Sequence, residues 1–208
     1  MSKRHVIFDI GGVLLDFDLP GLVSRASRGN PESAAALRAL RDHDSLRQLE
    51  SGFMTGEDYF EQFIRPVAPH WTFRDLIEGW KAIFSENRNG LDLLKNVRAS
   101  GAPVYLLSNL ADFNRIAIEE QFPGLFGLSD RNFFSYEMGC MKPDPAIFRR
   151  VVEAIGASPG DCLFLDDTPG HVEGARRFGL NGIVFERGRE AGVAAEVERW
   201  IAGSGGPA

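Results

Sequence analysis

Three short apolar runs of this chain each end in polar residues that could act together in catalysis. Carboxylates follow the first and third runs, a hydroxyl and an amide follow the second, and the set is Asp9, Ser108, Asn109, Asp166 and Asp167. The runs have the length and composition of buried β-strands. Because the carboxyl ends of parallel strands share one edge of a sheet, we expect these side chains to converge on one crevice.

A lysine and two glycines extend this set. Lys142 lies just before a predicted helix N-terminus, where anions are favoured. Gly11 and Gly12 follow Asp9 closely, and glycine lets the backbone present N–H groups to an anion. Carboxylates, a lysine and main-chain N–H groups together predict a Mg²⁺-assisted phosphate site, because Mg²⁺ takes carboxylate oxygens alongside substrate oxygens and water.

The elements that must position these residues alternate between strands and helices. Predicted strands lie at 6–8, 104–107, 133–134, 162–165 and 183–185, and predicted helices at 91–98, 112–121, 145–155 and 171–178. This alternation is typical of a parallel sheet with crossover helices. It predicts an α/β fold: a three-layer, Rossmann-like sandwich around a mostly parallel sheet.

Residues 19–88 break this alternation. They contain no convincing strand, and their helical stretches lie around 33–41, 57–64 and 74–84. Because the block follows the Asp9 loop directly, we expect an inserted helical cap, whose core includes Phe60, Phe63, Trp71 and Trp80. The α/β core would then comprise 1–18 and 89–202, and the glycine-rich tail 203–208 would be disordered.

Composition excludes several classes of protein. Of the 208 residues, 44% are hydrophobic and 25% charged, as in ordinary globular proteins. A net charge of −6 disfavours nucleic-acid binding, and no apolar run reaches the roughly 18 residues of a membrane span. With two cysteines and no secretion signal, we expect a cytoplasmic protein acting on a small phosphorylated metabolite. Both a monomer and a homodimer stay open.

Four ordered motifs give the chain a resemblance to a known family. They lie at residues 8–14, 106–109, 139–144 and 164–167, with the helical block after the first. In this arrangement the sequence resembles the haloacid dehalogenase superfamily of hydrolases, specifically its phosphatase branch with a helical cap. Each motif is short, and their order along nearly the whole chain makes the resemblance specific.

The resemblance implies a role for each residue of the site. Asp9 matches a nucleophile that forms an aspartyl-phosphate, later hydrolysed by water. Ser108 matches a hydroxyl that holds a phosphoryl oxygen, and Lys142 matches a cation that offsets negative charge. The implied phosphate contacts are Ile10, Gly11, Ser108, Asn109 and Lys142, although turn stabilisation explains Asn109 equally well. The implied Mg²⁺ ligands are Asp9, Asp166 and the Gly11 carbonyl, with Asp167 either a further ligand or an outer residue that orients the others.

Gly11 departs from the family's pattern. Most of its phosphatases carry a second aspartate at that position, which protonates the leaving group and activates water, and such help is worth about 10²–10⁴-fold. Three consequences stay open: another acid, such as Asp16, Asp18 or a cap residue; a preference for good leaving groups; or phosphate binding without turnover. We favour a working phosphatase, because the nucleophile, the lysine and the metal carboxylates are present.

Two other functions remain as alternatives. A regulatory phosphate-binding protein is one, and a metal-independent 2-haloacid dehalogenase is the other, although the paired acids Asp166 and Asp167 argue for a metal and for phosphorus. Family analogy suggests sugar phosphates as substrates. We expect the cap loop 50–56 to contact the substrate and His171 to cap or pack against a helix.

Overall fold

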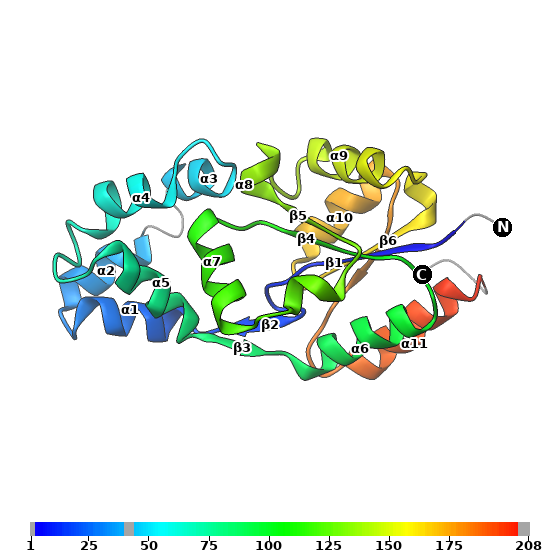
Figure 1. The fold of residues 1–208 in the computed structure, drawn as a ribbon, viewed down its shortest axis with the longest axis horizontal. Coiled ribbons are helices and arrows are strands. Elements are labelled where there is room, and N and C mark those ends of the chain that lie inside the picture. Colours follow the sequence, from blue (N-terminus) through cyan, green and yellow to red (C-terminus); the bar gives the residue numbers. More distant parts are fainter. Residues whose placement is uncertain (1–2, 40–43, 204–208) are drawn as a thin grey trace.

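The computed structural model describes residues 3–39 and 44–203. Its centre is a five-stranded sheet in the order β5-β4-β1-β6-β7, in which every neighbouring pair is parallel (Figure 1). The strands are β1 (His5–Phe8), β4 (Val104–Ser108), β5 (Arg131–Phe134), β6 (Cys162–Asp166) and β7 (Asn181–Val184). Each predicted strand overlaps one of these, which confirms the α/β fold.

Helices cover both faces of the sheet and make three layers. α6 (Arg88–Ala99) and α11 (Glu190–Ile201) lie on one face, and α9 (Pro145–Ile155) and α10 (Pro169–Phe178) on the other (Figure 1). In β1, Val6 and Phe8 are buried on the first face and Ile7 on the second. Successive strand residues point to opposite faces, so an uninterrupted apolar strand needs a helical layer on each side.

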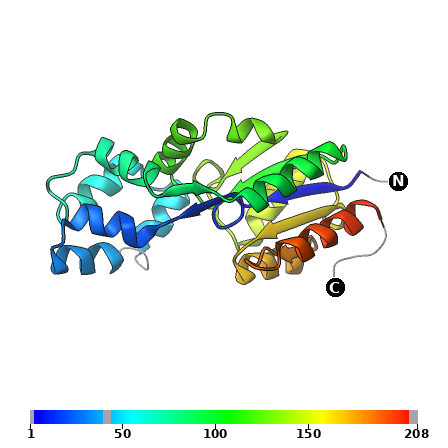
Figure 2. The same cartoon turned by 90° about the horizontal axis from the view of Figure 1, so that it is seen from below.

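A separate group of helices lies beyond the carboxyl ends of the strands (Figures 1 and 2). It comprises α1 (Leu19–Ser27), α2 (Pro31–Ala39), α3 (Asp44–Glu50), α4 (Gly56–Tyr59), a π-helix (Phe60–Ile64) and α5 (Phe73–Lys81). These helices bury their own apolar cluster, to which α7 (Asp112–Gln121) contributes Phe113 and Ala117. The expected inserted helical cap is therefore present, while the division at 18/19 and 88/89 stays a prediction.

One strand corrects the prediction that residues 19–88 contain none. β3 (Phe84–Glu86) pairs antiparallel with β2 (Leu15–Phe17), and this ribbon joins the sheet to the cap. Three-residue strands are too short for an alternating pattern to be visible in the sequence. Residues 40–41 of the predicted helix 33–41 and residues 204–208 of the predicted disordered tail lie outside the described residues. Across the parts of the chain that are described, no helix has the length and apolar composition needed to cross a membrane.

The start of α6 packs directly against the loop that follows the Asp9 strand. A Cβ atom on Gly90 would lie 1.8 Å from the carbonyl oxygen of Val13, which the backbone cannot accommodate without moving. We expect Gly90→Ala to lower the free energy of unfolding by about 1–3 kcal/mol, the usual cost of overpacking. Urea unfolding measures this. Gly127→Ala is the control, because a Cβ there meets no atom within 4 Å, and equal midpoints for the two variants would contradict the packing.

Candidate active site

A buried lysine joins two buried carboxylates at the carboxyl edge of the sheet. Asp9 follows β1, Asp166 ends the neighbouring strand β6, and Lys142 precedes α9. The Lys142 ammonium lies 2.9 Å from Oδ1 of Asp9 and 2.6 Å from Oδ2 of Asp166, and it donates to the Leu107 carbonyl at 3.1 Å. Its three N–H donors therefore have three oxygen partners, although only 1% of the residue is exposed.

Burial and the shared ammonium divide the negative charge unequally. Burial raises the pKa of Asp9 to about 7, against the opposing pull of Lys142. Burial also acts to raise the pKa of Asp166, but the positive charge of Lys142 and the contact with His171 hold that pKa well below its usual range. The two carboxylates raise the pKa of Lys142, against the effect of its burial. The lysine is thus charged, and a second positive charge would stabilise both carboxylates as anions.

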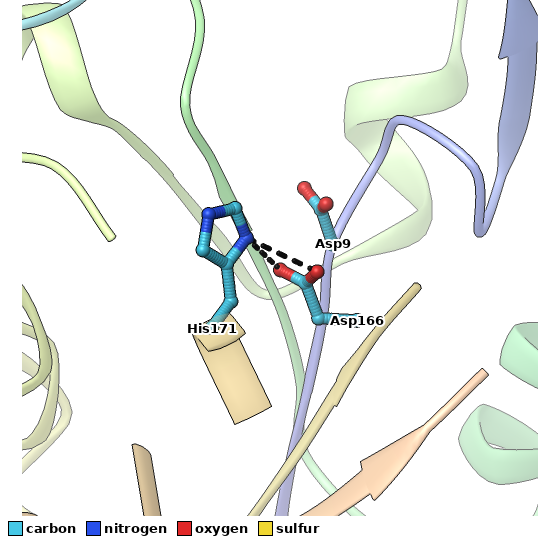
Figure 3. Close-up of side chains that lie close together, drawn as sticks. All are labelled: Asp9, Asp166 and His171. Atoms are coloured by element: carbon cyan, nitrogen blue, oxygen red, sulfur yellow. Dashed lines mark hydrogen bonds and ion pairs between the residues drawn. The ribbon is translucent and has the colours of Figure 1, made fainter. Parts of the chain in front are cut away.

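His171 joins the group from the first turn of α10 (Figure 3). Its Nδ1 lies 3.1 Å from each carboxylate oxygen of Asp166, while the Thr168 N–H donates to Oδ1 of Asp166 at 2.8 Å. Ligand atoms of Asp9, Asp166 and His171 lie within 4.8 Å of one another. The expectation of a capping or packing role missed this contact. Its signal was the position of His171 one helical turn beyond Thr168, on a helix that starts directly after the Asp166 strand.

Asp167 lies outside this group. Its side chain is exposed, and Oδ1 accepts a hydrogen bond from the Thr168 hydroxyl at 3.2 Å. It packs over Gly12, where φ is +72° and a Cβ atom would lie 2.1 Å from Oδ2 of Asp167. Adjacent positions at the end of β6 thus send one carboxylate into the crevice and leave the other at its rim.

The remaining predicted residues lie around the same crevice. Ser108 is buried at the end of β4. The Asn109 side chain accepts from the Lys142 N–H at 2.8 Å and donates to the Lys142 carbonyl at 3.0 Å, so it fixes the backbone that carries the lysine. The N–H of Ile10 donates to Oδ1 of Asp9 at 2.7 Å. Of the strand-end residues, Asp9, Ser108 and Asp166 are therefore buried, whereas Asn109 is half-buried and Asp167 is exposed.

A cavity of about 550 Å³ opens from the crevice into the cap. Ile10, Gly11, Ser108 and Asn109 lie at its core end, and side chains of the cap helices, of the β2–β3 ribbon and of α7 line the rest. Its volume lies in the range of small-molecule binding sites, about 300–1,000 Å³. Glu50, the last residue of α3, also lines it, and the expected contact of loop 50–56 with the substrate stays a prediction.

Known proteins are similar to this chain in sequence and in fold. Residues 3–179 match the family model of haloacid dehalogenase-like hydrolases. The chain is 34% identical over 202 residues to Phosphatase MT3486 of Mycobacterium tuberculosis, covering 90% of this chain and 89% of that protein. It is 25% identical over 194 residues to D-ribitol-5-phosphate phosphatase of Bacteroides thetaiotaomicron, covering 90% and 94%. A crystal structure of a HAD family enzyme from Bacteroides thetaiotaomicron, in complex with magnesium and inorganic phosphate, superposes with a TM-score of 0.74 at 24% identity, covering 90% and 96%.

Removal of the buried ammonium tests the charge arrangement. Lys142→Met would leave Asp9 and Asp166 buried without their cation, so we expect the free energy of unfolding to fall by about 3–5 kcal/mol. Lys95→Met is the control, because Lys95 is exposed and its ion pair with Asp92 spans 3.9 Å, which makes a change below about 1 kcal/mol expected. Urea unfolding of both variants at pH 7.5 measures the difference, and similar losses would contradict the arrangement.

Proposed function

Because this chain belongs to the haloacid dehalogenase-like hydrolases, we propose that it is a Mg²⁺-dependent phosphatase of small phosphate monoesters. The observation that carries the proposal is the state of the Asp9 carboxylate. Lys142 and the Ile10 N–H both contact its Oδ1, whereas Oδ2 has no hydrogen-bond or ion-pair partner among the described residues. A fixed carboxylate with one free oxygen, next to a buried ammonium, is suited to attack phosphorus.

The proposed reaction has two steps. In the first, Oδ2 of Asp9 bonds to phosphorus as the ester P–O bond breaks, and the departing oxygen takes a proton. In the second, water attacks phosphorus, the bond to Asp9 breaks, and phosphate leaves with the Asp9 carboxylate restored. The Lys142 ammonium offsets negative charge throughout, and the Ser108 hydroxyl holds a phosphoryl oxygen.

The site's donors fit Mg²⁺. Two buried carboxylates share a single ammonium, which leaves an excess negative charge for a hard divalent cation to balance. We assign Asp9, Asp166 and the Gly11 carbonyl as the protein ligands, with His171 and Asp167 orienting them from outside. When bound, the metal supplies positive charge to the phosphoryl oxygens.

The two loop acids considered as substitutes for an aspartate at position 11 are engaged elsewhere. Asp16 forms an ion pair with Arg187, and Asp18 caps α1 by accepting from the Gly21 N–H at 3.1 Å. The proton for the departing oxygen must therefore come from a cap residue, unless the leaving group is good enough to depart without one.

The absence of an acidic side chain at Gly11 is also compatible with one other function. A regulatory phosphate-binding protein would need the same anion site and no acid, and it would hold phosphate without releasing any from esters. The two functions differ in steady phosphate release.

Release of phosphate from p-nitrophenyl phosphate tests the proposal. We expect Mg²⁺-dependent turnover that EDTA abolishes and that Asp9→Asn reduces to the level without enzyme, because the amide cannot act as the nucleophile. Asp92→Asn, an exposed residue of α6, is the control and should retain full activity. Phosphate binding in calorimetry without any turnover would instead establish the regulatory protein.

A further inference from the structure

The cavity in the cap is lined mostly by apolar side chains. They come from the cap, from α7 and from the ribbon, and include Phe17, Leu22, Leu46, Trp71, Trp80 and Phe113. Phe17 is exposed, and Leu22, Leu46, Trp71 and Trp80 are half-buried, although the last three pack against the cap's apolar cluster. Their uncovered faces therefore border an apolar chamber that begins at the phosphoryl end of the site.

Polar groups in this chamber are few. Among the described residues that line it, Arg38 and Glu50 carry the only formal charges. A sugar would need a partner for each hydroxyl, and buried hydroxyls without partners are unfavourable. One lining residue offers a buried hydrogen-bond donor. Nδ2 of Asn114, a buried residue of α7, has no hydrogen-bond partner among the described residues.

We propose that the substrate is a phosphate monoester whose alcohol carries a hydrocarbon or aromatic body. The body fills the chamber, and a single acceptor on it can take a hydrogen bond from Asn114. This rests on the proposed function and departs from the sugar phosphates that family analogy suggests. Each additional buried CH₂ group should raise affinity about fourfold until the chamber is full.

Binding of unbranched alkyl phosphates to Asp9→Asn tests this without turnover. Two of the three tryptophans, Trp71 and Trp80, border the chamber, so tryptophan fluorescence reports occupancy. We expect the dissociation constant to fall severalfold with each added CH₂ from butyl to octyl phosphate, and ribitol 5-phosphate to bind more weakly than either.

A chamber variant and a surface variant complete this test. Leu46→Ser should flatten the dependence on chain length while the inhibition constant of inorganic phosphate stays unchanged. Ile116→Ser, on an exposed position outside the chamber, should leave both unchanged. No dependence on chain length, or tighter binding of ribitol 5-phosphate, overturns the substrate class. Chain-length-dependent binding without phosphate release from the wild type would overturn only the proposed function.

A second feature concerns the proton that the leaving oxygen needs. Three contacts fix the loop after α3 to the core: the Ser135 hydroxyl bridges the Glu50 carbonyl and the Leu110 N–H, and the Gly56 N–H donates to Asp112 at 3.0 Å. In the third, Gly52 lies so close to α8 (Ser135–Met138) that a Cβ atom would be 2.0 Å from a carbonyl oxygen. Glu50 is therefore held beside the segment that follows Ser108.

Glu50 lines the chamber, and the charges of Lys142 and His171 act on its carboxyl group. It is the only acidic residue among the described residues lining the chamber, which it shares with Gly11 and Ser108. Burial raises its pKa, although the positive charges of Lys142 and His171 act to lower it. Tyr59 also lines the chamber, and burial together with the Glu50 charge raises its pKa to about 12, so it stays neutral.

We infer that Glu50 is the general acid and base of the proposed phosphatase. Its carboxylic acid gives a proton to the ester oxygen as the P–O bond breaks. The resulting carboxylate takes a proton from the water that attacks the aspartyl-phosphate, which restores the acid. This inference rests on the proposed function but not on the nature of the substrate's alcohol.

Glu50→Gln should discriminate between leaving groups. An alkoxide needs the proton and p-nitrophenolate does not, so in single-turnover measurements of the first step we expect leaving-group release to slow by about 10²–10⁴-fold with alkyl phosphates and by less than about tenfold with p-nitrophenyl phosphate. The wild-type rate on alkyl phosphates should fall as pH rises through the raised pKa of Glu50, and the variant should lose this fall. Glu57→Gln, an exposed residue of the same segment, is the control.

A second substitution makes this test independent of folding. A Cβ atom at position 11 would lie 3.2 Å from the ring of Phe17, an exposed side chain that need move only a few tenths of an ångström, so the position can take a Cβ in Gly11→Asp. We expect it to restore alkyl phosphate turnover in Glu50→Gln. Equal slowing of the first step on both substrates, or no slowing on either, overturns the role of Glu50 while the phosphatase stands. Absence of p-nitrophenyl phosphate turnover in the wild type would overturn the phosphatase and this role together.

Discussion

The ammonium of Lys142 between Asp9 and Asp166 is the interaction on which the rest of the site depends. Burying three charged groups is costly, so a buried ion pair is weak evidence of a contribution to stability. Charged groups with strongly shifted pKa values cluster instead at functional sites. The surrounding contacts serve to hold these three groups: Asn109 fixes the lysine's backbone, and His171 fixes Asp166. Among the described residues, Oδ2 of Asp9 has no hydrogen-bond or ion-pair partner, and it is where the proposed chemistry begins.

Most of the fold, and the convergence of several site residues, could be predicted from the order of residues in the sequence. Buried parallel strands are short apolar runs, and their carboxyl ends must share an edge, so Asp9, Ser108 and Asp166 could be placed together before any coordinates. His171 could not, and Glu50 could be placed only as part of the loop 50–56 expected near the substrate, because their approach depends on where a helix begins and how the cap packs on the core. Asp166 and Asp167 have opposite environments, because successive side chains of a strand point to opposite sides.

The cap illustrates a further limit of sequence patterns. Apolar residues at helical spacing indicate that a face is covered but not by what. Phe60 is covered by protein, as expected of cap core, whereas Trp71 and Trp80 pack in the cap and also border the chamber. An amphipathic cap helix can thus serve both the folding of the cap and the binding of an apolar ligand, and only the cavity distinguishes the two.

The central claim is that Asp9 itself becomes phosphorylated. Mixing the enzyme with substrate and Mg²⁺, quenching within the first turnover, and reducing with borohydride would convert a phosphorylated Asp9 to homoserine, which peptide mass spectrometry locates. The account predicts homoserine at position 9 in the wild type, dependent on substrate and Mg²⁺. Phosphate release with an unmodified Asp9 under these conditions would contradict it.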